Sequence, residues 1–271
     1  MIAIVGIIGG NFYGIALAAV SVSLLLAHNL WLVAKNKTIA DDERLRIEIN
    51  TSDHFPVSES AVKPERIADF RCFSSDGSVA ITEHRVENQS LVAHVKRNRQ
   101  CLVALALYPH PINLDAEKFR AYISEEEASA EVCERLPAEG APQRESYTKY
   151  AKALVKGENG SGEIFRRVVG HKLEIIPEQN PCDLGGSGRL PVQVLFDGAP
   201  LAGLRVSSGC EQLNEGGYAA HTRTDGDGRA MVELTASGYW FIRTHFIRSH
   251  PDARIADWES FWASLTFQVN V

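Results

Sequence analysis

The sharpest chemical feature of this sequence is a histidine placed where a processed chain would begin. An uncharged apolar run ends at Leu25-Leu26-Ala27, and His28 follows directly. Cleavage after Ala27 would put a free α-amino group and an imidazole on one residue. These two nitrogens together form a bidentate chelate for a transition metal ion such as nickel, cobalt or copper. His28 is therefore the first predicted metal ligand.

An N-terminal chelate needs at least one further ligand, commonly a second imidazole. Three of the nine histidines are candidates: His245 near the end of an apolar run, His110 between two prolines, and His54 before Phe55. No two histidines have HxH or HxxxH spacing, so distant segments would have to assemble the site. The alternative for each of the three is a surface or hydrogen-bonded structural histidine.

Two carboxylates near the C-terminus are candidates for a supporting role. Asp257 and Glu259 flank Trp258, and on an extended strand they would face the same side. From there they could accept hydrogen bonds from metal-bound imidazoles and orient them. The alternative is a polar pair in a loop whose tryptophans complete the core.

Motifs for catalysis are missing from the sequence. It contains no GxSxG turn, no phosphate-binding loop and no HExxH motif. We therefore expect a protein that is not an enzyme, with copper-dependent oxidation on the same chelate as the exception left open.

The first 27 residues predict export. Residues 1–34 carry no charged side chain, and residues 15–27 have the length and apolarity of a signal peptide core. A positively charged segment is missing before this core, so an uncleaved membrane anchor is the alternative to a cleaved signal peptide. The expected location is the periplasm or the cell exterior.

Composition favours a globular protein without a nucleic-acid partner. The chain has 271 residues, is 45% hydrophobic and 23% charged, and has a formal net charge of −6. Nucleic-acid binding calls for a clustered basic face. The densest basic cluster, residues 96–99, lies between two strand-like runs and is typical of a solvated turn.

Short β-branched and aromatic runs with polar turns between them predict a mainly β fold of two antiparallel sandwiches. The first domain is predicted over residues 28–165, with a helical insertion at about 114–155. Within that insertion, Phe119, Tyr122 and Ile123 follow a capping Asp115, and residues 147–154 form a second expected helix. The second domain is predicted over residues 166–271, with a turn at residues 224–229.

Several longer strings resemble known families. Residues 196–203 (FDGAPLAG), 224–229 (TDGDGR) and 238–243 (GYWFIR) resemble the prealbumin-like sandwich, of the transthyretin or carboxypeptidase-regulatory type. The wider chain resembles the uncharacterised exported bacterial family numbered 4198 among domains of unknown function. The strings that carry this second resemblance are residues 27–32 (AHNLWL), 114–122 (LDAEKFRAY), 147–155 (YTKYAKALV) and 256–265 (ADWESFWASL).

The second resemblance implies a two-sandwich exported protein, similar to the periplasmic accessory component of nickel and cobalt uptake transporters. Metal binding or delivery, with a membrane transporter complex as partner, is therefore the first expected function. The alternative is a non-catalytic interaction module whose loops contact proteins or glycans.

Overall fold

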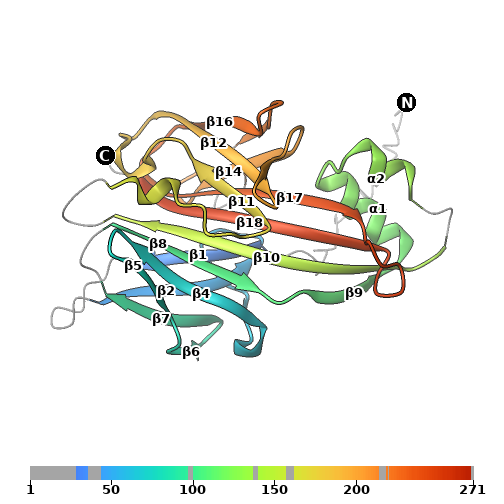
Figure 1. Cartoon of the computed structure of the whole chain (residues 1–271), viewed down its shortest axis with the longest axis horizontal. Coiled ribbons are helices and arrows are strands. Elements are labelled where there is room, and N and C mark those ends of the chain that lie inside the picture. Colours follow the sequence, from blue (N-terminus) through green and yellow to red (C-terminus); the bar gives the residue numbers. More distant parts are fainter. Residues whose placement is uncertain are drawn as a thin grey trace, which may run out of the picture.

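The computed structural model describes residues 29–35, 44–96, 100–136, 140–156, 162–213, 218 and 220–269. Within these ranges the chain forms three stacked β-sheets and two short helices, so the predicted mainly β class is confirmed (Figure 1). The predicted signal peptide or anchor, residues 1–27, lies outside the described residues, as does His28. Of the helices that are described, none combines the length and apolarity needed to cross a membrane.

The central sheet has the strand order β15-β14-β17-β18-β10-β8-β4-β5, and β9 pairs with the first part of β10. Neighbouring strands are antiparallel except for β10 and β18, which run parallel. Its strands are β4 (Ile67–Ser74), β5 (Gly77–Ala80), β8 (Cys101–Leu107), β9 (His110–Leu114), β10 (Gln143–Val155), β14 (Arg205–Cys210), β15 (Ala220–Arg223), β17 (Gly238–Ser249) and β18 (Trp258–Val269).

An outer sheet packs on each face of the central one (Figure 1). The first comprises β1 (Asn29–Lys35), β2 (Arg44–Ser52), β3 (Ser60–Ala61), β6 (His84–Glu87) and β7 (Ser90–Lys96). The second comprises β11 (Leu173–Pro177), β12 (Gly188–Phe196), β13 (Ala199–Pro200) and β16 (Arg229–Leu234). The main apolar cores lie in these two interfaces, and a smaller aromatic cluster joins β1 to β17.

The helix predicted over residues 147–154 is wrong, because these residues belong to β10. Ala151 and Ala153 of this strand face the first core, whereas Leu154 faces the second. A strand buried on both faces has apolar residues at odd and even positions and lacks the alternation that reveals a half-buried strand. The helical spacing of tyrosine, alanine and leucine in residues 147–154 is therefore a coincidence.

The first part of the predicted helical insertion is confirmed. Helix α1 (Ala116–Glu125) begins at Asp115, whose side chain accepts a hydrogen bond from the Lys118 backbone N–H at 2.8 Å. Phe119, Tyr122 and Ile123 are buried, and a short helix α2 (Ala130–Glu134) follows. Both helices lie beside the protruding ends of β10, β17 and β18 (Figure 1).

The central sheet takes strands from both sides of the predicted domain boundary at residues 165/166. Strands β4, β5, β8, β9 and β10 precede it, and β14, β15, β17 and β18 follow it. The two predicted sandwiches therefore share their middle layer.

Three single-turn 3₁₀ helices lie in connections: η1 (Pro64–Arg66), η2 (Glu163–Arg166) and η3 (Pro181–Asp183).

The string at residues 224–229 forms a tight turn between β15 and β16. The Asp225 carboxylate accepts hydrogen bonds from the backbone N–H groups of Asp227 and Arg229, each at 2.9 Å. Gly228 has φ +71°, and a Cβ there would lie 2.8 Å from the Val194 carbonyl oxygen. This turn therefore carries the chain from the central sheet to an outer one, and only glycine fits at its end.

A buried histidine makes the stability of this fold depend on pH. Burial, helped by the charge of Lys152, lowers the pKa of His171 to about 3, and the ring stacks on Tyr150 at 4.9 Å. The pKa of this histidine is lower in the folded state than in the unfolded state, where it is near 6.5. Its contribution to stability is therefore fully present at pH values above 6.5 and is lost as the pH falls.

We therefore expect wild type to lose stability relative to His171→Leu between pH 6.5 and 4, with a slope approaching about 1.4 kcal/mol per pH unit. Urea unfolding of both proteins across this pH range measures the difference between their free energies of unfolding. The contributions of the other titrating groups are common to both proteins and cancel in this difference. Parallel stability curves for the two proteins would contradict the expectation.

Candidate functional site

A cluster of buried polar side chains lies where helix α1 covers β10, β17 and β18. We call Tyr122, Glu126, Glu145, Arg243 and His245 the polar cluster. All five are buried although four of them are ionisable near neutral pH or charged. Burial of such groups is costly unless they satisfy one another, so a cluster of this kind marks a site of function or of strong structural constraint.

Arg243 and Glu126 form a bidentate ion pair at one end of the polar cluster. The Arg243 Nη1 and Nη2 atoms donate to the two Glu126 carboxylate oxygens at 2.8 and 2.9 Å. Burial alone would raise the pKa of Glu126, but the charge and hydrogen bonds of Arg243, together with the charges of His245 and Arg205, outweigh it, and the pKa lies below its usual value. The guanidinium carbon also lies 4.8 Å from the Tyr218 ring centre and 5.4 Å from that of Trp262.

Tyr122 links His245 to Glu145 at the other end. Its hydroxyl oxygen lies 2.6 Å from His245 Nε2 and 3.3 Å from Glu145 Oε1. When Nε2–H donates to Tyr122 and Tyr122 donates to Glu145, the Nδ1 atom of His245 keeps its lone pair. Burial lowers the pKa of His245 to about 4, so the ring is neutral near pH 7. A neutral, oriented imidazole is the state that a metal ion binds.

Glu145 has the electrostatic properties of a group that can hold a proton. Burial raises its pKa to about 7, even though the hydroxyls of Ser260 and Tyr122 donate to its carboxylate. A small cavity with about 10 Å³ of space for a water centre adjoins Glu145, Tyr122 and Lys149. Glu145 can therefore take up or release a proton near neutral pH.

The described chain begins beside this cluster. Asn29 is buried, and its side-chain amide donates to the Tyr218 hydroxyl at 3.0 Å. Tyr218 in turn packs on Arg243. One residue along β1, the Leu30 carbonyl accepts a hydrogen bond from Ser264 of β18 at 2.5 Å. These contacts fix the start of β1 over the part of β18 that carries Trp262, whose ring centre lies 4.2 Å from that of His245.

The predicted histidine ligands do not come together in the described part of the chain. His54 is exposed after β2, and its Nδ1 lies 3.6 Å from Glu59 Oε1. His110 begins β9 with its ring centre 5.5 Å from that of Tyr147. His245 is buried in β17 with its ring centre 4.2 Å from that of Trp262. His28, the fourth, lies outside the described residues.

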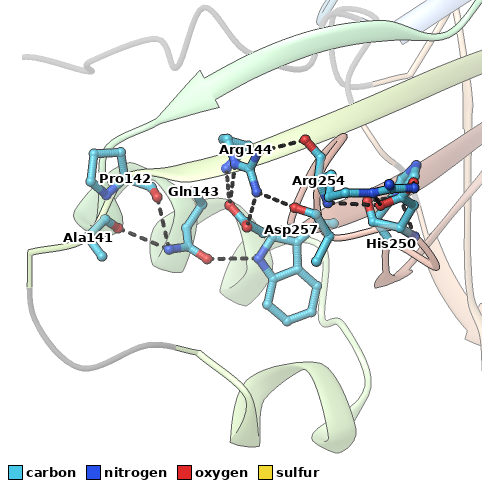
Figure 2. A network of polar contacts seen from close by, with 10 residues as sticks. Ala141, Pro142, Gln143, Arg144, His250, Arg254 and Asp257 are labelled. Atoms are coloured by element: carbon cyan, nitrogen blue, oxygen red, sulfur yellow. Dashed lines mark hydrogen bonds and ion pairs between the residues drawn. The ribbon is translucent and has the colours of Figure 1, made fainter.

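The two predicted carboxylates are occupied by arginines. Figure 2 shows Asp257 against Arg144, which donates to it through its backbone N–H at 2.9 Å and through Nη2 at 2.8 Å. Glu259 accepts from Arg248 Nε at 2.5 Å. No contact of either carboxylate with an imidazole is found among the described residues. Instead, Asp257 links the start of β18 to β10, and Glu259 links β18 to β17.

The described residues offer too few donor groups to hold a metal ion by themselves. Residues 29–269, apart from the undescribed gaps, hold no group of three or more His, Cys, Asp or Glu side chains placed for one ion. Of the polar cluster, only His245 was singled out from sequence. The others were missed because Arg243 and Glu145 belong to strands and Glu126 to an acidic run typical of a solvated helix face; a charged residue inside an apolar run, as at Arg243, was the available signal.

Comparisons with known proteins bear on the family. A family model described as "Domain of unknown function (DUF4198)" matches residues 25–248. None of the curated proteins matches the chain. Among solved structures, the "D0-D1 domain of Intimin" aligns with 89% of this chain and 98% of its own, at 11% sequence identity and a TM-score of 0.22. Similarity at that level is too weak to support an inference.

Proposed function

The chain belongs to the family described as Domain of unknown function (DUF4198), and from this premise we propose that it is an exported protein that binds a transition metal ion. The ligands in this proposal are the amino group and Nδ1 of His28, freed by cleavage after Ala27, together with Nδ1 of His245. Nickel, cobalt and copper all suit such a nitrogen set. Delivery of the ion to a membrane transporter complex is the role that we propose for the complex of protein and metal.

The observation that carries this proposal is the position of Asn29. Its hydrogen bond to Tyr218 holds the residue after His28 next to the polar cluster, in which His245 is neutral and held through Nε2. Arg243 already neutralises the Glu126 carboxylate, so the site favours nitrogen over oxygen donors. Two nitrogens on one residue also explain how a site could form where the described side chains alone offer too few ligands.

A panel of histidine variants tests which imidazole completes the site. In the mature protein we expect His245→Gln to weaken metal binding by at least about tenfold, because loss even of a group that only supports a ligand costs about 10–100-fold. His54→Gln and His110→Gln are the matched controls, and both should keep the affinity within about twofold. Calorimetric titration with nickel, cobalt and copper measures these affinities.

The panel also has outcomes that contradict the proposal. An unchanged affinity in His245→Gln, with the protein folded as judged by its near-ultraviolet circular dichroism, would remove His245 from the site. Loss of binding in His54→Gln or His110→Gln would place the ion on a different face. If the mature protein binds none of the three metals, the alternative function, a non-catalytic interaction module, takes its place.

A further inference from the structure

An open groove of about 240 Å³ lies beside the polar cluster, between the edge of the first outer sheet and the β8–β9 and β10 strands. Its walls carry Lys63, Arg66, His110 and Lys149, with the Tyr147 ring among them. No aspartate or glutamate is found among its described lining residues. A concave surface with cations and no anions among its lining residues concentrates positive potential.

Two of these cations are held in place by the fold. The Arg66 guanidinium donates from Nη2 to the Tyr108 carbonyl at 3.0 Å, and its carbon lies 5.5 Å from the Tyr147 ring centre. Its Nε atom is buried and makes no hydrogen bond within the described residues. Lys149 Nζ lies 5.2 Å from the centre of the same ring, and only 8% of this residue is exposed.

The charges that act on Lys149 leave the groove positive. Burial, together with the charges of Arg66 and Arg243, lowers the pKa of Lys149 to about 8, while Asp53 and Glu145 oppose this shift. Burial likewise lowers the pKa of His110, followed by the charges of Arg66, Lys63 and Lys149. Mutual repulsion among these groups is therefore a cost that a bound anion would relieve.

We propose that this groove binds a small anion with two or more carboxylate or phosphate oxygens, held between Arg66 and Lys149. The guanidinium of Arg66 and the ammonium of Lys149, which both line the groove, supply charge-assisted hydrogen bonds, and the Tyr147 ring forms a flat wall between them. Lys63, exposed at the rim, draws the anion in. The site does not depend on His28 or His245, so it stands or falls separately from the proposed metal site.

Titration of the full mature protein with inorganic phosphate and with succinate tests the proposal and separates the two sources of the anion. We expect saturable binding of one ion per chain, with one of the two anions preferred. Arg66→Gln and Lys149→Met should each weaken it by about tenfold or more, since a hydrogen bond to a charged group contributes about 1.5–3 kcal/mol. Lys63→Gln, on the exposed rim, should weaken it by about two- to threefold, as a surface charge does.

Arg189→Gln is the matched control, because Arg189 is an exposed arginine of β12 paired with Glu233, away from the groove. It should leave the affinity unchanged within about twofold. If Arg66→Gln fails to fold, Arg66→Lys keeps the charge but removes the planar guanidinium and its paired donors, and the same weakening is expected. Absence of saturable binding of both anions to wild type would overturn the proposal, and so would equal weakening by Arg189→Gln and Arg66→Gln.

Discussion

Replacing Glu174 by glutamine is expected to lower the free energy of unfolding by about 3–5 kcal/mol, the usual cost of removing one partner of a buried ion pair. Its carboxylate lies 2.9 Å from Lys152 Nζ, and both side chains are almost wholly excluded from solvent. It also accepts hydrogen bonds from the Val169 and Gly170 backbone N–H groups at 2.9 and 3.2 Å. Among the described residues, Glu174 is the acidic group that acts on the Lys152 charge.

The expected loss of stability arises because Lys152 loses its ion-pair partner in this variant. Burial lowers the pKa of Lys152, and Glu174 is the group that opposes this shift. With a neutral amide opposite, the lysine must either stay charged in an apolar core or release its proton, and both cost free energy. The pair joins β10 of the central sheet to β11 of an outer sheet, so its loss weakens the contact between two layers.

Urea unfolding of Glu174→Gln measures this cost, with Glu233→Gln as the matched control. Glu233 makes the same kind of ion pair with Arg189, but both side chains are more than half exposed. Exposed pairs contribute about 0–1 kcal/mol. The double variant Lys152→Met, Glu174→Leu should regain much of the loss because it removes both charges. A cost for Glu174→Gln no greater than that of the control would contradict the account.

The half-buried parts of this fold were open to prediction from sequence, and the doubly buried part was not. The run at residues 44–49 alternates apolar and polar residues and is a strand, and Asp115 caps a helix as predicted. In β10, by contrast, Lys152 stands among alanine, leucine and valine. A lysine in such a run suggests a solvated helix face. It can be buried in a strand only because Glu174, which comes 22 residues later in the sequence, pairs with it.

The candidate site was harder to predict for a related reason. His245 was singled out because it lies in an apolar run, and the structure places it in a buried network. Its partners Tyr122 and Glu145 are 123 and 100 residues away in sequence, and such pairings arise from the packing of α1 and from strand register rather than from any local spacing. Asp257 and Glu259 were chosen for their alternation, but register set them against Arg144 and Arg248 instead.

The second large effect is the loss of metal affinity that we expect when the α-amino group of His28 is blocked. One extra alanine before His28 converts its amine into an amide, which has no basic lone pair for a metal ion. The chelate is then reduced to a single imidazole. Because loss of a group that merely supports a ligand costs about 10–100-fold in affinity, loss of a ligand within a chelate should cost about 100-fold or more. Folding should not change, since Asn29 keeps its contact with Tyr218.

Competition titration with nickel, cobalt and copper, on protein shown by N-terminal sequencing to begin at His28 and on the version with the added alanine, is the most direct test of metal binding through His28. The account predicts one tightly bound ion per chain in the first protein and an affinity lower by about 100-fold or more in the second. Both proteins should unfold at the same urea concentration. Equal affinities in the two proteins, or no binding in either, would contradict metal binding by the N-terminal histidine.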